Sequence, residues 1–260
     1  VPVIEKIRGF HLDHGYSSVK VPRKERRRVV GPGEVGRVFS FDLRPEVSTY
    51  LIRGEVEDEA ALEELRQSIA EDPDGVGVFS DPRISAIATC PGSPVGTHQD
   101  VAERLRVVTL QNRGMDGSNV VVAVVDTGIN LNHLREKGQD PIFDGARSWS
   151  PIADSVLGDM PVDHGTMCAF DVGIAAPRCT LLDYALLQSQ ATGGSAMDGF
   201  LSDAVRGFSQ LLDLMTGPNA PSALVVNNSW GMFHSSWDFP VGHPGNYSDN
   251  PEHPFNIIVE

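Results

Sequence analysis

The chain has 260 residues, of which 35 are acidic and 21 basic, and its formal net charge is −14. Hydrophobic residues make up 40% and charged residues 22%, a composition typical of a folded globular protein rather than of a disordered chain. No run of about 18 apolar residues occurs, which excludes a membrane-spanning helix. The acidic balance argues against nucleic acid as a partner.

Charge and composition divide the chain into three segments. Residues 1–36 contain a basic run at 20–28 and little periodicity, so we expect a solvated basic arm. Residues 1–95 hold 13 basic and 16 acidic side chains, whereas residues 96–260 hold 8 and 19. This shift and the turn-rich Pro91–Pro94 predict a linker. We therefore predict a small α+β module at 37–95 and a larger domain at 96–260.

The small module is predicted to have a β-α-β layout. Residues 50–56 read as a strand, and Asp58 is a good N-cap for a helix with apolar residues at helical spacing. The turn residues 73–75 end that helix, and residues 76–87 read as one or two further strands. One helix would then cover a small sheet.

The larger domain alternates strands and helices. The continuous β-branched run at 120–125 predicts a strand buried on both faces, as in a parallel sheet. Further along we predict helices at 165–176 and 197–214, a strand at 179–187 and a buried strand at 222–227. This alternation indicates an open α/β domain with a mostly parallel sheet.

Three short motifs carry the chemistry. Asp126 ends the apolar run, His164 stands at a predicted helix start, and Ser229 follows the last predicted strand. A carboxylate beside an imidazole fixes its tautomer and stabilises the imidazolium, so the other ring nitrogen can deprotonate a weak nucleophile. Functional groups gather at the carboxyl ends of parallel strands, and Asp126 and Ser229 stand at two such ends.

In this order and spacing, the motifs resemble those of the subtilisin-like serine proteases. The matching stretches are Val-Val-Asp126-Thr-Gly-Ile, His164-Gly-Thr-Met-Cys-Ala and Asn227-Asn-Ser229-Trp-Gly231. The resemblance implies a mostly parallel sheet with helices on both faces. It also implies that Asp126 orients the general base His164, that the substrate is a peptide or protein, and that no cofactor is required.

The resemblance also implies where substrate binds. Asn228, Ser229, Trp230 and Gly231 would form one wall of the primary specificity pocket and hold an extended peptide by backbone hydrogen bonds. Gly193 and Gly194 resemble the loop across the cleft. Residues 37–95 would correspond to the family's ferredoxin-like prodomain, which assists folding and blocks the cleft, and residues 232–255 to a cleft loop.

The sequence departs from the family in its nucleophile. The family's Gly-Thr-Ser motif and its oxyanion Asn, which follow the Asn-x-Ser-x-Gly strand, are absent. Ser195 follows two glycines but precedes that strand, where the family places a cleft loop, so we do not assign it as the nucleophile. We therefore expect the 260-residue chain alone to be inactive and its sheet to have an open edge. We expect a second polypeptide, made by internal cleavage near Glu260, to supply both groups.

Several alternatives stay open. One is a metal-dependent hydrolase that uses Asp126, Asp163 and His164, with His133 as a further ligand. Another is that the chain is the non-catalytic half of a subtilisin-like protein, with a protein-binding or regulatory role. The resemblance to the subtilisin-like proteases also leaves open a structural calcium ion, to which residues 140–144 would contribute ligands.

The cysteines raise a separate expectation. Three of them, Cys90, Cys168 and Cys179, are too few for a disulfide framework. Cys168 lies one helical turn after His164, as in the kexin-like branch of the family. If it is partly exposed, activity would be sensitive to mercurials or other thiol reagents.

Overall fold

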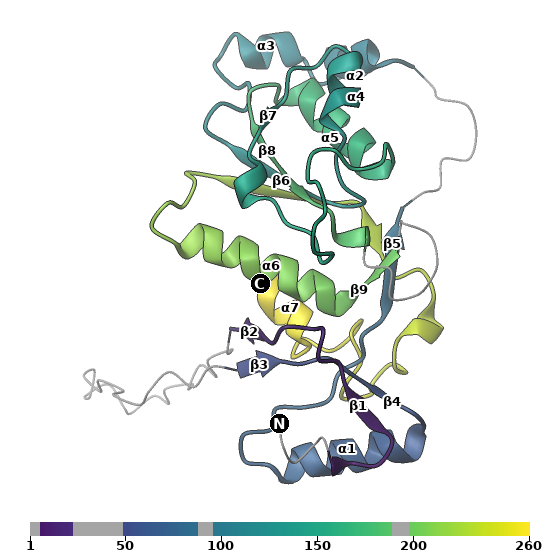
Figure 1. Cartoon of the computed structure of the whole chain (residues 1–260). Helices are drawn as coiled ribbons and strands as arrows, with labels where there is room; N and C mark the ends of the chain where they lie inside the picture. Colours follow the sequence, from purple (N-terminus) through teal and green to yellow (C-terminus); the bar gives the residue numbers. More distant parts are fainter. Residues whose placement is uncertain (1–5, 23–48, 88–95, 189–197) are drawn as a thin grey trace, which may run out of the picture. The chain divides into compact units, whose positions relative to one another are not determined.

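The structure is a computed structural model, and it describes residues 6–22, 49–87, 96–188 and 198–260. The chain forms two compact units (Figure 1), one of Val1–Ser80 with Val241–Glu260 and one of Asp81–Pro240. The predicted linker Pro91–Pro94 and most of the predicted basic arm lie outside the described residues. Residues 81–87 thus belong to the second unit, and residues 241–260 to the first.

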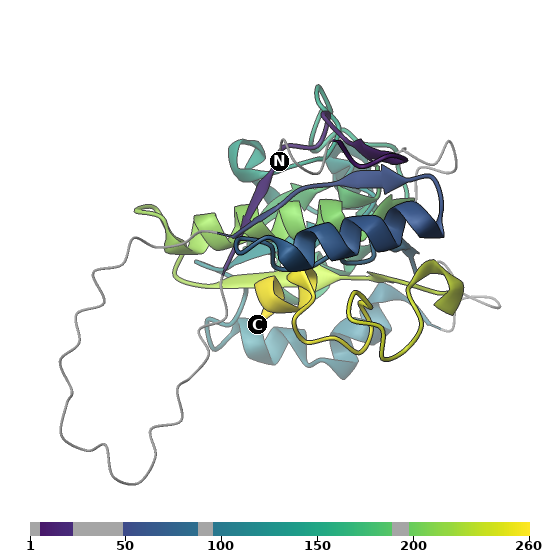
Figure 2. The same cartoon turned by 90° about the horizontal axis from the view of Figure 1, so that it is seen from below.

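The first unit contains two separate antiparallel strand pairs. Strand β1 (Phe10–Leu12) pairs with β4 (Gly54–Val56), and β2 (Val19–Val21) pairs with β3 (Thr49–Leu51). Helix α1 (Glu59–Glu71) packs on β1 and β4 (Figure 1 and Figure 2). As predicted, the Asp58 side chain caps this helix by accepting from the Ala61 N–H.

The strand predicted at residues 50–56 is interrupted. It divides into β3 and β4, which pair with different partners. The described residues of this unit contain two-stranded sheets rather than one ferredoxin-like sheet. The sequence pattern missed the break because each half has only three residues, too few for a change of partner to show in the alternation of side chains.

Residues 241–260 join the first unit through aromatic packing. Helix α7 (Pro254–Val259) closes this segment. The His253 ring packs edge-on against Phe79 and Tyr247, and its Nε2 lies 3.0 Å from the Ser80 carbonyl oxygen. The cleft loop predicted at residues 232–255 therefore contributes its second half to this unit.

A four-stranded parallel sheet forms the centre of the second unit. Its order is β10 (Leu224–Asn228), β6 (Val121–Val125), β8 (Thr180–Tyr184) and β7 (Ile142–Phe143). All five residues of β6 are buried, as the apolar run predicted. The mixed α/β class with a parallel sheet is therefore confirmed.

Helices pack on the two faces of this sheet (Figure 1). On one face, Val122, Val124 and Leu181 form a core with residues of α4 (Leu131–Glu136) and α5 (His164–Ala175). On the other face, Tyr184 packs against Trp149, which in turn abuts Gly207 of α6 (Leu201–Thr216). The remaining helical segments are α2 (His98–Arg104), α3 (Val107–Gln111), η2 (Gly145–Arg147), η3 (Leu186–Gln188) and η4 (Ser235–Trp237).

A second, three-stranded antiparallel sheet occurs in this unit. Strand β5 (Arg83–Ala86) lies between β11 (Trp230–Gly231) and β9 (Asp198–Phe200). The helix predicted at 197–214 therefore begins four residues later, at Leu201, because residues 198–200 are extended to pair with β5. Of the strands predicted over 76–87, the structure contains β5 alone.

Strand β10 is at the edge of the parallel sheet rather than buried within it. It pairs with β6, and no strand of the described residues pairs with its other side. The strand predicted at 222–227 is therefore present, but its predicted burial was wrong, since Val225 is 53% exposed. Among the described residues, no helix is long and apolar enough to cross a membrane.

Candidate active site

The end of strand β6 and the start of helix α5 bring Asp126 and His164 together. Asp126 follows β6, and His164 is the first residue of α5, whose N-cap is Asp163. The His164 Nδ1 lies 2.9 Å from Oδ2 and 3.0 Å from Oδ1 of Asp126. The pairing expected from the motifs is therefore present as a carboxylate–imidazole contact.

The backbone around Asp126 holds its carboxylate in place. The Thr127 N–H donates to Asp126 Oδ1 at 2.7 Å, and the Thr127 hydroxyl accepts from the Gly165 N–H at 2.8 Å. Asp126 is fully buried, and burial raises the pKa of its carboxyl, while the hydrogen bonds from Thr127 and His164 oppose that rise. The hydrogen bonds thus stabilise the ionised form that an imidazolium partner requires.

Gly165 permits the close approach of the two motifs. A Cβ at this position would lie 2.5 Å from the carbonyl oxygen of Gly128 and 3.2 Å from the Asp126 Cβ. The Gly that follows His164 in the motif is therefore required by the packing of α5 against the loop after β6.

The other ring nitrogen of His164 is available. Both hydrogen bonds of the imidazole to Asp126 use Nδ1, and Nε2 has no hydrogen-bond partner among residues 6–22, 49–87, 96–188 and 198–260. The side chain of His164 is 13% exposed. This is the arrangement that a general base needs, with one nitrogen oriented by a carboxylate and the other open.

Cys168 lies behind the imidazole, one turn along α5. Its Sγ is 3.7 Å from His164 Nδ1 and 3.8 Å from Asp126 Oδ2. Burial raises the pKa of this thiol to about 11, although a hydrogen bond with the Ser229 side chain lowers it. A protonated thiol on the Nδ1 side is not a nucleophile activated by His164.

The predicted binding residues lie on β10, β11 and the turn between them. Asn228 ends β10, Ser229 follows it, and Trp230 and Gly231 form β11. The Ser229 side chain is near enough to Cys168 to lower the pKa of its thiol, so this turn adjoins the Asp126–His164 pair. Gly193, Gly194 and Ser195 lie outside the described residues.

The chain's own strand β5 pairs with these residues. Ala86 is in register with Trp230, and Ser85 with Gly231. The Ile87 N–H then donates to the Ser229 carbonyl oxygen at 3.0 Å. Strand β5 therefore runs toward the Asp126–His164 pair, and Ile87 is its last described residue.

The structure brings together a metal-ligating group different from the one predicted. Among the described residues, ligand atoms of Asp126, His164 and Cys168 lie within 4.8 Å of one another. Asp163 is outside this group because its carboxylate accepts from the His164 N–H. His133 is also outside it, and its Nδ1 lies 3.7 Å from Glu136. The predicted hydrolase ligand set is therefore not assembled.

The acidic stretch considered for calcium has other partners. Asp144 accepts from the Arg147 Nε at 2.7 Å and from the Arg147 backbone N–H at 3.1 Å. No group of three ligands includes residues 140–144 within the part of the chain that the structure describes.

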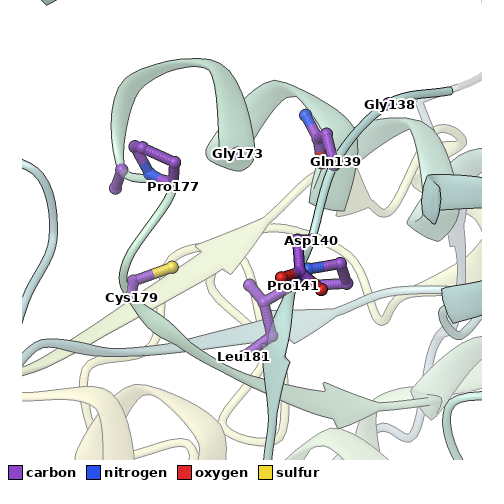
Figure 3. Close-up of a pocket in the computed structure, with 9 residues that line it drawn as sticks. Gly138, Gln139, Asp140, Pro141, Gly173, Pro177, Cys179 and Leu181 are labelled. Carbon is purple, nitrogen blue, oxygen red and sulfur yellow. The ribbon is translucent and has the colours of Figure 1, made fainter.

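A small pocket occurs away from this pair. It has a volume of about 180 Å³ and lies between the end of α5 and the start of β8 (Figure 3). Its lining includes Gln139, Pro177 and Cys179. Because it adjoins the amino end of β8, whereas Asp126 follows the carboxyl end of the neighbouring strand, it is not part of the candidate site.

No protein-family model matches the chain, and no curated protein matches it.

Sequence reasoning missed three residues near β5. Arg83 forms an ion pair with the nearly buried carboxylate of Asp198, and its guanidinium carbon lies 5.5 Å from the ring centroid of Trp237. No local signal marks them, because Arg83 and Asp198 are separated by 115 positions in the sequence.

Proposed function

We propose that this chain carries the Asp and His of a subtilisin-like serine endopeptidase. The observation that supports the proposal most directly is the buried Asp126 carboxylate on His164 Nδ1, with Nε2 open. In the proposed reaction, Nε2 takes the proton of a serine hydroxyl as that oxygen attacks the peptide carbonyl. The same proton then passes to the leaving amine.

Strand β5 gives independent support. A protease of this kind holds its substrate as an extended strand against the edge of the cleft. Here an extended segment of the chain pairs antiparallel with the predicted binding residues Trp230 and Gly231. We interpret residues 83–87 as occupying the substrate position, as a prodomain-like segment would.

We further propose that the serine and the oxyanion donor come from a segment or chain outside this sequence. No hydroxyl is hydrogen-bonded to His164 Nε2 among the described residues. The free edge of β10 and the 53% exposure of Val225 give such a segment a place to add to the parallel sheet. Alone, the chain lacks the nucleophile and is inactive.

A fluorophosphonate probe followed by denaturing intact-mass measurement tests this function. The sample is the protein purified from its native source, so that any associated chain is retained. We expect a second polypeptide that carries the probe mass. Finding the 260-residue chain alone and unlabelled would overturn the proposal.

The second candidate is a peptide-binding protein that does no chemistry. It is favoured by one observation, the occupation of the β11 edge by β5 without a nucleophile in the described residues. The same probe experiment separates the two, since a binding protein takes up no fluorophosphonate. A metal-dependent hydrolase is the weaker alternative, because Asp163 is committed to capping α5.

A further inference from the structure

Strand β5 is held by side chains as well as by its backbone. Backbone pairing alone accepts almost any extended sequence, whereas side-chain contacts make a site selective. The contacts of Asp81, Arg83 and Ile84 therefore indicate which peptides the position between β9 and β11 favours.

The first contact fixes the start of the segment. The Asp81 carboxylate accepts from the Ser202 N–H and from the Ser202 hydroxyl, each at 2.7 Å. Ser202 is the second residue of α6, so the first turn of this 16-residue helix receives a negative charge. The Leu201 N–H also donates to the Pro82 carbonyl oxygen at 3.1 Å.

The second contact recognises a basic side chain. The Arg83 guanidinium forms an ion pair with Asp198, whose side chain is 7% exposed, and stacks near Trp237. A buried carboxylate that loses its cationic partner is strongly destabilised, and an acidic side chain in the same place would be repelled. The Trp237 ring adds a cation–π contact, which an aliphatic residue cannot make.

The third feature is the burial of one face of β5. The β5 side chains alternate in burial, with Ile84 fully buried and Ala86 7% exposed. In contrast, Ile87 is 48% exposed. A substrate strand would thus need a branched apolar residue in place of Ile84 and a small residue in place of Ala86.

We propose that Asp198 and Trp237 are specificity-determining residues that select peptides with a basic side chain at the position of Arg83. That position is four residues before the one whose N–H binds the Ser229 carbonyl. As a statement about cleaved substrates, the inference rests on the proposed function. Favoured peptides then have the pattern basic, apolar, any, small at the positions of residues 83–86.

Charge-swap variants of the full chain test the contact directly by hydrogen exchange. Either Arg83→Glu or Asp198→Lys should raise the exchange rate of residues 81–87 by about tenfold or more, because like charges then face each other. The double variant should return the rate to within about threefold of the original by restoring an opposite pair. Unchanged exchange in β6 and β10 serves as the control for folding.

A peptide supplied in trans tests selection. The probe is a fluorescein-labelled peptide of the sequence Asp-Pro-Arg-Ile-Ser-Ala-Ile, and its host is the Arg83→Glu chain, whose own strand binds poorly. The probe should bind about tenfold more tightly than the same peptide with Glu in place of Arg. The order should reverse in a host that carries Asp198→Lys and keeps Arg83, because like charges again weaken the binding of its own strand.

Three outcomes overturn the inference: single swaps that leave exchange unchanged, a double swap that fails to rescue, or equal affinity for the two peptides. Because these are binding measurements, they do not depend on the nucleophile. Selective binding without fluorophosphonate labelling would reject the protease and retain the recognition site. Labelling without charge selection would reject the recognition site alone.

Discussion

Oδ2 of Asp126 lies 2.9 Å from Nδ1 of His164, and the two side chains come from the end of a buried strand and the start of a helix. Parallel strands and their following helices converge at one edge of the sheet. That convergence places residues 38 positions apart in contact and leaves Nε2 of the imidazole open.

Removing the imidazole should abolish activity of the completed protease. With the serine-bearing chain present, His164→Ala should lower turnover by several orders of magnitude, because no base remains for the serine proton. Asp126→Asn should lower it about 10⁴-fold by favouring the wrong tautomer. Peptide hydrolysis and fluorophosphonate labelling measure both effects.

The matched control for that experiment is His133→Ala, which changes a histidine of α4 outside the candidate site. It should leave turnover unchanged. Near-normal turnover in the His164 variant would contradict the assigned role.

Substituting Gly165 should disturb the candidate site through packing alone. A Cβ here meets the Gly128 carbonyl oxygen at 2.5 Å, so Gly165→Ala should destabilise the chain by about 1–3 kcal/mol. Urea unfolding measures the loss. The control is Gly138→Ala. Gly138 has a positive φ, but a Cβ there meets nothing within 4 Å, so this variant measures the destabilisation from backbone strain alone. Equal losses in the two variants would argue against the close packing.

The Cys168 thiol should react slowly near neutral pH. Its pKa of about 11 leaves about one thiol in 10³ ionised at pH 8, and thiolate is the reactive form. In a chain carrying Cys90→Ser and Cys179→Ser, the iodoacetamide rate should rise about tenfold per pH unit between about pH 8 and 10.

Ser229→Ala tests whether the Ser229 side chain lowers the pKa of the Cys168 thiol. The hydrogen bond with Ser229 lowers the thiol pKa, so its removal should slow alkylation further. A rate that levels off below about pH 9 would show a thiol less perturbed than the structure implies.

Asp183 should make the chain less stable as pH rises. Burial raises the pKa of its carboxyl to about 7, the Gly158 N–H opposes this, and the charge of Asp126 adds to it. Between the unfolded pKa and 7 the folded state binds more protons than the unfolded state, so stability falls over that window. The free energy of unfolding should therefore fall by on the order of 2 kcal/mol between pH 5 and pH 8, and Asp183→Asn should remove this fall. Urea unfolding at each pH measures it.

Asp144→Asn is the control, because the pKa of Asp144 is shifted in the opposite direction to that of Asp183. Partial burial raises the pKa of Asp144, but the hydrogen bonds and charge of Arg147 outweigh it and hold the pKa below its usual value. Its stabilisation is therefore present at both pH 5 and pH 8 and is lost only as pH falls through the folded pKa. The variant should be destabilised equally at the two pH values. An Asp183 variant that behaves in the same way would contradict the raised pKa.

The sequence by itself determined the local features. The apolar run predicted β6, Asp58 predicted the start of α1, and the helical stripe predicted most of α6. These features depend on neighbours within about one or two turns, through capping and periodicity. The Asp126 and His164 motifs were paired on a different basis, the resemblance of their order and spacing to a known family, because each motif alone is a weak signal.

Only the tertiary structure decided how distant segments pair. The sequence did not indicate that β5 would leave the N-terminal module and lie between β9 and β11, or that Arg83 would meet Asp198. Nor did it indicate that Val225 would be exposed or that Asp183 would be buried. Strand partners and burial depend on the path of the whole chain, because any short apolar strand can satisfy its backbone hydrogen bonds with many partners.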